Sequence, residues 1–95
     1  MKLYKIWQEV NRGHDTYDSA IVAAESEEEA RKSQVDVYYE WDDSENSWMF
    51  ECRDGSRKKE NNYSWAHPDD IKVEYIGEAK EGTEKGVILA SFNSG

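Results

Sequence analysis

Residues 3–10 read LYKIWQEV and residues 17–24 read YDSAIVAA, and these two segments decide the fold. In the first segment apolar and polar side chains alternate, which places Tyr4, Ile6 and Val10 on one side of a half-buried strand. The second segment is rich in small and β-branched residues, with Ile21 and Val22 at its centre. The turn formers NRGHD lie between them at residues 11–15. We therefore predict an antiparallel hairpin, from which the rest of the fold extends.

A helix start follows this hairpin directly. In the sequence SEEE at residues 26–29, the Ser26 hydroxyl can accept from the amide of Glu29, and the Glu29 carboxylate can reach back to the amide of Ser26. Three glutamates in the first turn suit the positive end of a helix, and Arg31 and Lys32 suit the opposite end. The pattern predicts a short helix over residues 27–34.

Residues 35–41 fit two periodicities. Ala30, Gln34, Val37 and Trp41 would share a helical face, whereas the alternation along residues 35–41 is typical of a strand. We favour the strand, followed by the polar turn 42–46 and a second strand at residues 48–52. Residues 35–53 then form a second hairpin, with Trp41 and Trp48 as cross-strand neighbours near its tip.

The remaining residues complete an α+β fold. Residues 54–62 are expected to form a solvated loop, and residues 63–68 an irregular stretch that Trp65 anchors to the core. Strands are predicted at residues 71–76 and 86–92, and the second, as the most continuously apolar segment, is expected at the centre of the sheet. The predicted order is β-β-α-β-β-β-β, a twisted antiparallel sheet with one short helix packed on one face. Residues 1–95 form one domain, with residues 35–64 inserted in the scaffold as an acidic, aromatic hairpin and a basic loop.

Composition narrows the class of protein. The 95 residues include 21 acidic and 12 basic side chains, a formal net charge of −9, and 13% aromatic residues. The aromatic content favours a folded domain over a disordered acidic chain. A deficit of cations argues against direct nucleic-acid or anionic-membrane binding, so a basic protein is the expected partner. The amino end turns polar too soon for a signal peptide, no segment resembles a membrane span, and the single cysteine, Cys52, fits a reducing cytoplasm.

The acidic residues are concentrated in one segment. The segment from Glu25 to Glu51 contains ten acidic residues and only two basic ones, Arg31 and Lys32. These 27 residues therefore carry nearly the whole net charge of the chain. Carboxylates around aromatic anchors on a hairpin could imitate the phosphates that a nucleic-acid-binding protein expects. The alternative is that the acidity serves solubility. The residues we expect at a partner-binding surface are Glu40, Trp41, Asp42, Asp43, Glu45 and Trp48, with the two tryptophans exposed as hot spots.

A small basic patch follows that segment. Guanidinium and ammonium groups beside aromatic rings could hold a phosphate-bearing nucleotide, and the candidates are Arg53, Arg57, Lys58, Tyr63 and Trp65. The other interpretation, which we favour, is a loop that balances neighbouring acids, because no glycine-rich phosphate cradle is present.

Metal and catalytic chemistry have little support in the sequence. His14, His67 and Cys52 lack the spacing of metal ligands, so no metal site and no cofactor are expected. Cys52 falls on the apolar side of its predicted strand, where a thiol is usually inert. No serine has a recognisable general base and orienting partner in the sequence, as nucleophilic catalysis would require. Acidic residues are abundant, but without a recognisable pocket their number does not indicate general acid–base catalysis. We expect a protein that is not an enzyme.

Three segments carry a resemblance to a known family: YDSAIVAAESEEEAR at residues 17–31, VEYIGEA at 73–79 and, most specifically, GVILASFNSG at 86–95. Together they are similar to small phage and prophage proteins with no assigned activity. The resemblance implies a phage accessory protein of the kind often used against host defence. Our leading expectation is an anti-CRISPR-like inhibitor in the cytoplasm of an infected bacterium, binding a basic defence nuclease. Alternatives are a sponge for a nucleotide immune signal and an accessory protein without a defence role; a homodimer is possible through the strand edges.

Overall fold

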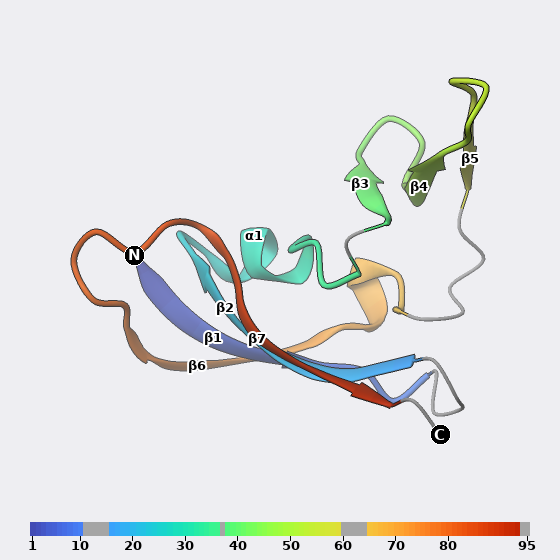
Figure 1. Ribbon diagram of the computed structural model, residues 1–95. Coiled ribbons are helices and arrows are strands. Elements are labelled where there is room, and N and C mark those ends of the chain that lie inside the picture. The colour runs from blue at the N-terminus through green and yellow to red at the C-terminus, as the bar shows by residue number, and fades with distance from the viewer. Residues whose placement is uncertain (11–15, 37, 60–64, 94–95) are drawn as a thin grey trace.

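The computed structural model describes residues 1–10, 16–36, 38–59 and 65–93 (Figure 1). For Phe92 and Asn93 it describes the backbone alone. Within these ranges the chain forms seven strands, one α-helix and one 3-10 helix. In order they are β1 (Lys2–Trp7), β2 (Thr16–Ala24), α1 (Glu27–Arg31), β3 (Glu40–Asp42), β4 (Ser47–Glu51), β5 (Arg57–Lys59), η1 (Pro68–Asp70), β6 (Lys72–Glu78) and β7 (Gly86–Asn93). This is a sheet-rich α+β arrangement, as the sequence predicts.

The larger sheet has four antiparallel strands in the order β6-β1-β2-β7. The predicted first hairpin is confirmed, with Tyr4 opposite Val22 and Ile6 opposite Ala20. These four side chains share one face and are all buried, as period-2 alternation requires. The predicted turn residues 11–15 lie outside the described part of the chain.

One hydrophobic core lies on that face. Figure 1 shows α1 and the small sheet on the same side of the four-stranded sheet. Ala30 from α1 and Trp48 from β4 pack with Ile6 and Val22 in a single cluster. Trp65, predicted as an anchor, belongs to the same cluster and is only 2% exposed. The core therefore joins the two sheets.

The second sheet corrects the single sheet that the sequence predicts. β3, β4 and β5 form a separate antiparallel meander. Trp41 lies opposite Trp48 as predicted, with ring centroids 5.4 Å apart in an edge-on arrangement. The expectation of a loop over residues 54–62 is wrong at 57–59, because Arg57–Lys59 pairs with β4. A tight turn returns the chain there: the Cys52 amide donates to the Ser56 carbonyl at 2.7 Å.

The helix and the strand after it are both shorter than predicted. α1 ends at Arg31 rather than residue 34, since the amides of Lys32 and Ser33 donate to carbonyls three residues back. The predicted strand 35–41 is found only at Glu40–Asp42. Asp36 closes a turn instead, accepting from the Tyr38 amide through its side chain and from the Tyr39 amide through its carbonyl.

β7 is an edge strand, which contradicts the prediction that it lies at the centre of the sheet. It pairs with β2, and Val87 and Ala90 pack against the core. Ile88 and Leu89 are 53% and 67% exposed. The continuous apolar run indicated burial on both faces, but only one face of this strand is covered.

Candidate functional site

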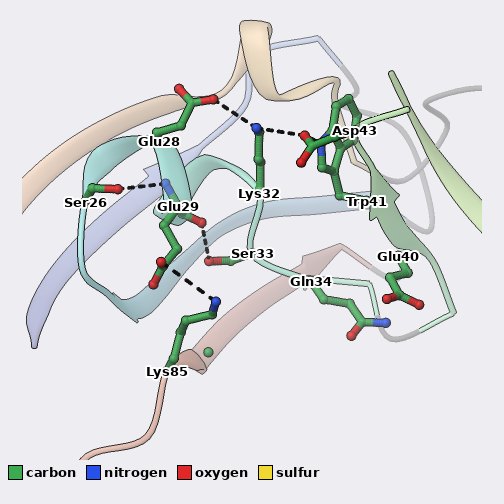
Figure 2. Close-up of a pocket in the computed structure, with 11 residues that line it drawn as sticks. Ser26, Glu28, Glu29, Lys32, Ser33, Gln34, Glu40, Trp41, Asp43 and Lys85 are labelled. Carbon is green, nitrogen blue, oxygen red and sulfur yellow. Dashed lines mark hydrogen bonds and ion pairs between the residues drawn. The ribbon is translucent and has the colours of Figure 1, made fainter. Parts of the chain in front are cut away.

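A cleft of about 640 Å³ lies between α1, β3 and the start of β7 (Figure 2). Four carboxylates and two ammonium groups line it, together with one indole ring and small polar residues. The lining residues are Ser26, Glu28, Glu29, Lys32, Ser33, Gln34, Glu40, Trp41, Asp43, Lys85 and Gly86. We call this the acidic cleft. It joins three segments that are far apart in the sequence.

Capping fixes the helical side of the cleft. The Ser26 hydroxyl accepts from the Glu29 amide at 3.2 Å, as predicted. The Glu29 carboxylate accepts from the amide of Glu25, at 3.1 Å, rather than from that of Ser26. Its second oxygen lies 3.8 Å from the Lys85 ammonium. The helix start is therefore tied to the chain just before β7, and Glu28 stands beside it on the first turn.

Lys32 connects the helix to the hairpin across the acidic cleft. Its ammonium lies 2.9 Å from Asp43 Oδ1 and 3.1 Å from Glu28 Oε1, and Figure 2 shows it between the two carboxylates. These hydrogen bonds, first the one with Asp43 and then the one with Glu28, raise the pKa of Lys32 above its usual value. Asp43 also accepts from Trp41 Nε1 at 2.7 Å. Lys32 and Trp41, in that order of effect, lower the pKa of Asp43.

The Trp41 indole forms the aromatic wall of the acidic cleft and is held in place on two sides. Its ring meets Trp48 edge-on, and the His67 imidazole at a centroid distance of 5.0 Å. His67 Nδ1 accepts from the Asp69 amide at 3.1 Å, so Nε2 carries the proton and donates to Asn46 Oδ1 at 3.2 Å. The hairpin tip is thereby joined to the start of η1, and Trp41 contacts one ring from β4 and one from the residue that caps η1.

The structure places the predicted partner-binding residues in different environments. Glu40, Trp41 and Asp43 line the acidic cleft. Asp42 lies elsewhere: its Oδ1 accepts from the Ser44 hydroxyl at 2.6 Å and its Oδ2 lies 3.0 Å from Arg57. Glu45 lies 3.7 Å from Lys59. Trp48 is 2% exposed, so the expectation that both tryptophans are exposed is wrong for this one.

Sequence reasoning missed the helical half of the site and the contribution from the far end of the chain. Glu28 and Glu29 belong to the acidic segment 25–51, but the sequence pattern identifies them only as part of a helix-capping signal. Lys85 and Gly86 follow residues 78–84, and no motif in the sequence connects them to the hairpin. The charge distribution could have indicated Glu28 and Glu29, whereas the position of Lys85 and Gly86 depends on how β7 pairs with β2.

The structure places the described members of the predicted nucleotide-binding set in different environments. Trp65 is in the core, and Arg57 is paired with Asp42. Arg53 and Lys58 are exposed, and Tyr63 lies outside the described residues. The contacts of Arg57 and Lys59 with hairpin carboxylates support the interpretation of the loop as a balance for neighbouring acids.

The described residues also bear on metal binding and on membrane insertion. Within the described ranges, no group of three or more His, Cys, Asp or Glu side chains is placed to hold a metal ion. Cys52 is a half-exposed free thiol just after β4, rather than the core residue that the sequence suggested. No helix in the described part of the chain has the length and apolar character needed to cross a membrane.

The comparisons with known proteins add no relative. The chain has no significant match among protein-family models, curated proteins or solved structures.

The hydrogen bonds and ion pairs of the Asp42 and Asp43 carboxylates predict how the free energy of unfolding depends on pH. Both have pKa values below the ordinary 3.8, Asp42 chiefly through the Ser44 hydroxyl and the Glu45 amide, and Asp43 chiefly through Lys32. Their stabilising effect is therefore complete above the unfolded-state pKa and is lost as the pH falls through the lower folded-state values. Urea unfolding from about pH 6 to about pH 2 should show a decline below about pH 4. Asp42→Asn should make that decline shallower, whereas the exposed Asp18→Asn should leave it unchanged; equal slopes for both variants would contradict the assignment.

Proposed function

We propose that this protein is a non-enzymatic binding module whose acidic cleft captures basic side chains of a partner protein. The observation that carries the proposal is that Glu28, Glu40 and Asp43, from two separate segments, line one cleft with the Trp41 ring. A guanidinium or ammonium group gains both from the carboxylates and from the face of an indole ring. Both kinds of group, carboxylates and an indole ring, are among the lining residues of the acidic cleft, which supports the proposal.

The charge balance of the cleft supports a cationic partner. Lys32 already neutralises part of the negative charge of Glu28 and Asp43, and the Lys85 ammonium lies near the Glu29 carboxylate. Glu40 is exposed, and among the described residues it forms no ion pair with a lysine or arginine. Glu25 and Glu27 line a neighbouring hollow together with Lys2 and Tyr75, which extends the acidic surface beyond the cleft. A partner with several basic side chains could therefore meet several carboxylates at once.

In the more specific form of the proposal, the partner is a nucleic-acid-binding defence protein, and the carboxylates take the place of phosphates in its groove. A net charge of −9 favours fast capture of a basic groove. The resemblance of residues 17–31, 73–79 and 86–95 to phage and prophage proteins supports a role as a counter-defence inhibitor in the cytoplasm of an infected bacterium. Binding alone would suffice for such a role.

A defined peptide tests the first half of the proposal. We expect an arginine-rich peptide to bind, with an affinity that falls at least about tenfold between about 50 mM and about 200 mM salt, because the contacts are exposed ion pairs. A peptide of equal length with citrulline in place of arginine serves as the matched control. Isothermal titration calorimetry measures both. Equal binding of the two peptides, or no dependence on salt, would contradict the acidic cleft as the binding surface.

Phage plating tests the second half. Bacteria that carry a nucleic-acid-guided nuclease and also express this protein should restore plating of a targeted phage, whereas bacteria without the nuclease should show no change. If the arginine-rich peptide binds but plating stays restricted across a panel of such nucleases, the counter-defence role is wrong and an accessory role remains. Calorimetry with a panel of signalling nucleotides distinguishes the proposal from the alternative of a nucleotide sponge, because a protein that mimics phosphates should bind no nucleotide.

A further inference from the structure

β7 leaves one edge of the four-stranded sheet without a partner strand among the described residues. The strand contains no charged residue from Gly86 to Asn93, in a chain of which 35% is charged. Leu89, opposite Ile21 on the adjacent strand, is 67% exposed. An edge strand has a row of unpaired N–H and C=O groups that can pair with another chain, and charged side chains are the usual protection against this. β7 lacks that protection.

The opposite edge of the same sheet shows the contrast. β6 also exposes apolar side chains, with Ile76 47% exposed. It carries Lys72, Glu74 and Glu78 along its length, however, and its register with β1 is broken by an irregularity near Tyr4. Charges and bulges both discourage edge-to-edge pairing. The two edges therefore differ in charge rather than in apolar exposure.

A three-residue segment of β7, from Leu89 to Ser91, has the regular backbone that pairing needs and lies between two register shifts, of which the second falls between Ser91 and Phe92. The register of β7 with β2 shifts first around Ile88, the residue between Val87 and Leu89 that has no opposite partner. From Leu89 to Ser91 the register with Ile21, Ala20 and Ser19 is continuous. The free edge is thus a short, uncharged and regular segment that begins with Leu89, the most exposed aliphatic side chain among the described residues.

We propose that this edge is a homodimer interface, in which β7 pairs antiparallel with β7 of a second copy around a two-fold axis near Ala90. The two four-stranded sheets then form one continuous eight-stranded sheet. A two-fold interface uses the same patch on both copies, so an uncharged strand meets an uncharged strand and no charge is buried. In this register Leu89 lies opposite Ser91 of the second copy and diagonally across from the Leu89 of that copy, in addition to its contact position beside Ile21.

Charge separation favours the antiparallel orientation of the two copies. Lys85 and Gly86, at the start of β7, line the acidic cleft. Antiparallel pairing places the two clefts at opposite ends of the paired strands, about 25 Å apart at about 3.4 Å per residue. That spacing exceeds the Debye length of about 8 Å at physiological salt. Parallel pairing would put the two clefts side by side and add repulsion between chains that each carry a charge of −9.

Sedimentation equilibrium of the full chain over a range of concentrations tests the proposal. We expect a monomer–dimer equilibrium that strengthens as salt rises, because salt screens repulsion between the two acidic copies. Leu89→Lys should weaken the dimer at least about a hundredfold, since the change acts twice in a two-fold interface and removes apolar burial each time. The matched control is Ile76→Lys on β6, which introduces the same group at the other edge and should leave the dimer intact.

Each outcome decides for or against the β7 interface. A monomer at all concentrations, or a dimer that Leu89→Lys leaves intact, would overturn the proposal; so would a dimer that Ile76→Lys disrupts and Leu89→Lys does not. Circular dichroism of both variants confirms that the fold is retained, and if Leu89→Lys fails to fold, Ser91→Lys on the same edge replaces it. Peptide binding at the acidic cleft weakens with salt whereas dimerisation strengthens, so failure of one proposal is distinguishable from failure of the other.

Discussion

Replacing Trp48 by alanine should lower the free energy of unfolding by about 3–5 kcal/mol, the range for truncating a buried aromatic side chain. Trp48 is 2% exposed and packs in the core beside Ile6 and Val22. Its Nε1 donates to the Ala66 carbonyl at 2.8 Å in a buried setting. Truncation leaves a cavity between the two sheets and an unsatisfied carbonyl. Urea unfolding followed by far-UV circular dichroism measures the loss.

Two related variants separate the causes of this loss. Trp48→Phe keeps an aromatic ring but removes the donor to Ala66, and should cost about 1–3 kcal/mol. Trp41→Ala removes a half-buried ring at the cleft and should cost less than Trp48→Ala. If Trp41→Ala destabilises the protein more than Trp48→Ala does, then Trp48 is not the residue that joins the sheets.

The sequence predicts the local elements well, because their signals are local. The alternation in residues 3–10, the turn formers after it and the capping serine at residue 26 each act within a few residues. Trp41 and Trp48 could be paired because the polar turn 42–46 sets the register of their hairpin. The first hairpin, the Trp41–Trp48 pair and the Ser26 cap are confirmed. The first strand ends at Trp7, however, and Val10, expected on its buried side, is 58% exposed. The turn formers at residues 11–15 lie outside the described part of the chain.

The arrangement of the elements depends on interactions that the sequence pattern does not encode. The apolar run in β7 is the same whether one face or both are covered, so its place at the sheet edge could not be inferred. The alternation at residues 35–41 also indicated a strand, but the Asp36 side chain favoured a turn by accepting from the Tyr38 amide. Local hydrogen bonding of this kind competes with strand pairing.

The candidate site shows the same division. The acidic hairpin was recognisable from composition, and Glu40, Trp41 and Asp43 do share a cleft. Trp48 alternates with its neighbours in a way that fits either face of a strand, and only the packing of the small sheet against the larger one shows that it points into the core. Buried and exposed aromatic residues are hard to tell apart from sequence alone.

Reversing two charges in the acidic cleft should weaken binding of an arginine-rich peptide about a hundredfold. In the double variant Glu28→Lys with Glu40→Lys, two attractive contacts become repulsive, each costing about tenfold or more in affinity. Both residues line the cleft, from α1 and β3 respectively, and both are exposed, so the fold should tolerate the changes. Lys32 keeps its contact with Asp43, which preserves the link between helix and hairpin.

A double variant of equal charge distinguishes this site from a general effect of acidity. Glu74→Lys with Glu81→Lys changes the net charge by the same amount. Glu74 is exposed and lies opposite Lys5 on the four-stranded sheet, and Glu81 lies between β6 and β7. The long-range field of the protein changes equally in both double variants, whereas contacts in the acidic cleft change only in the first. We therefore expect the control to bind the peptide within about threefold of the original protein at physiological salt, where charges separated by more than about 8 Å are largely screened. Equal losses in the two variants would mean that net charge, rather than the cleft between α1 and β3, governs recognition.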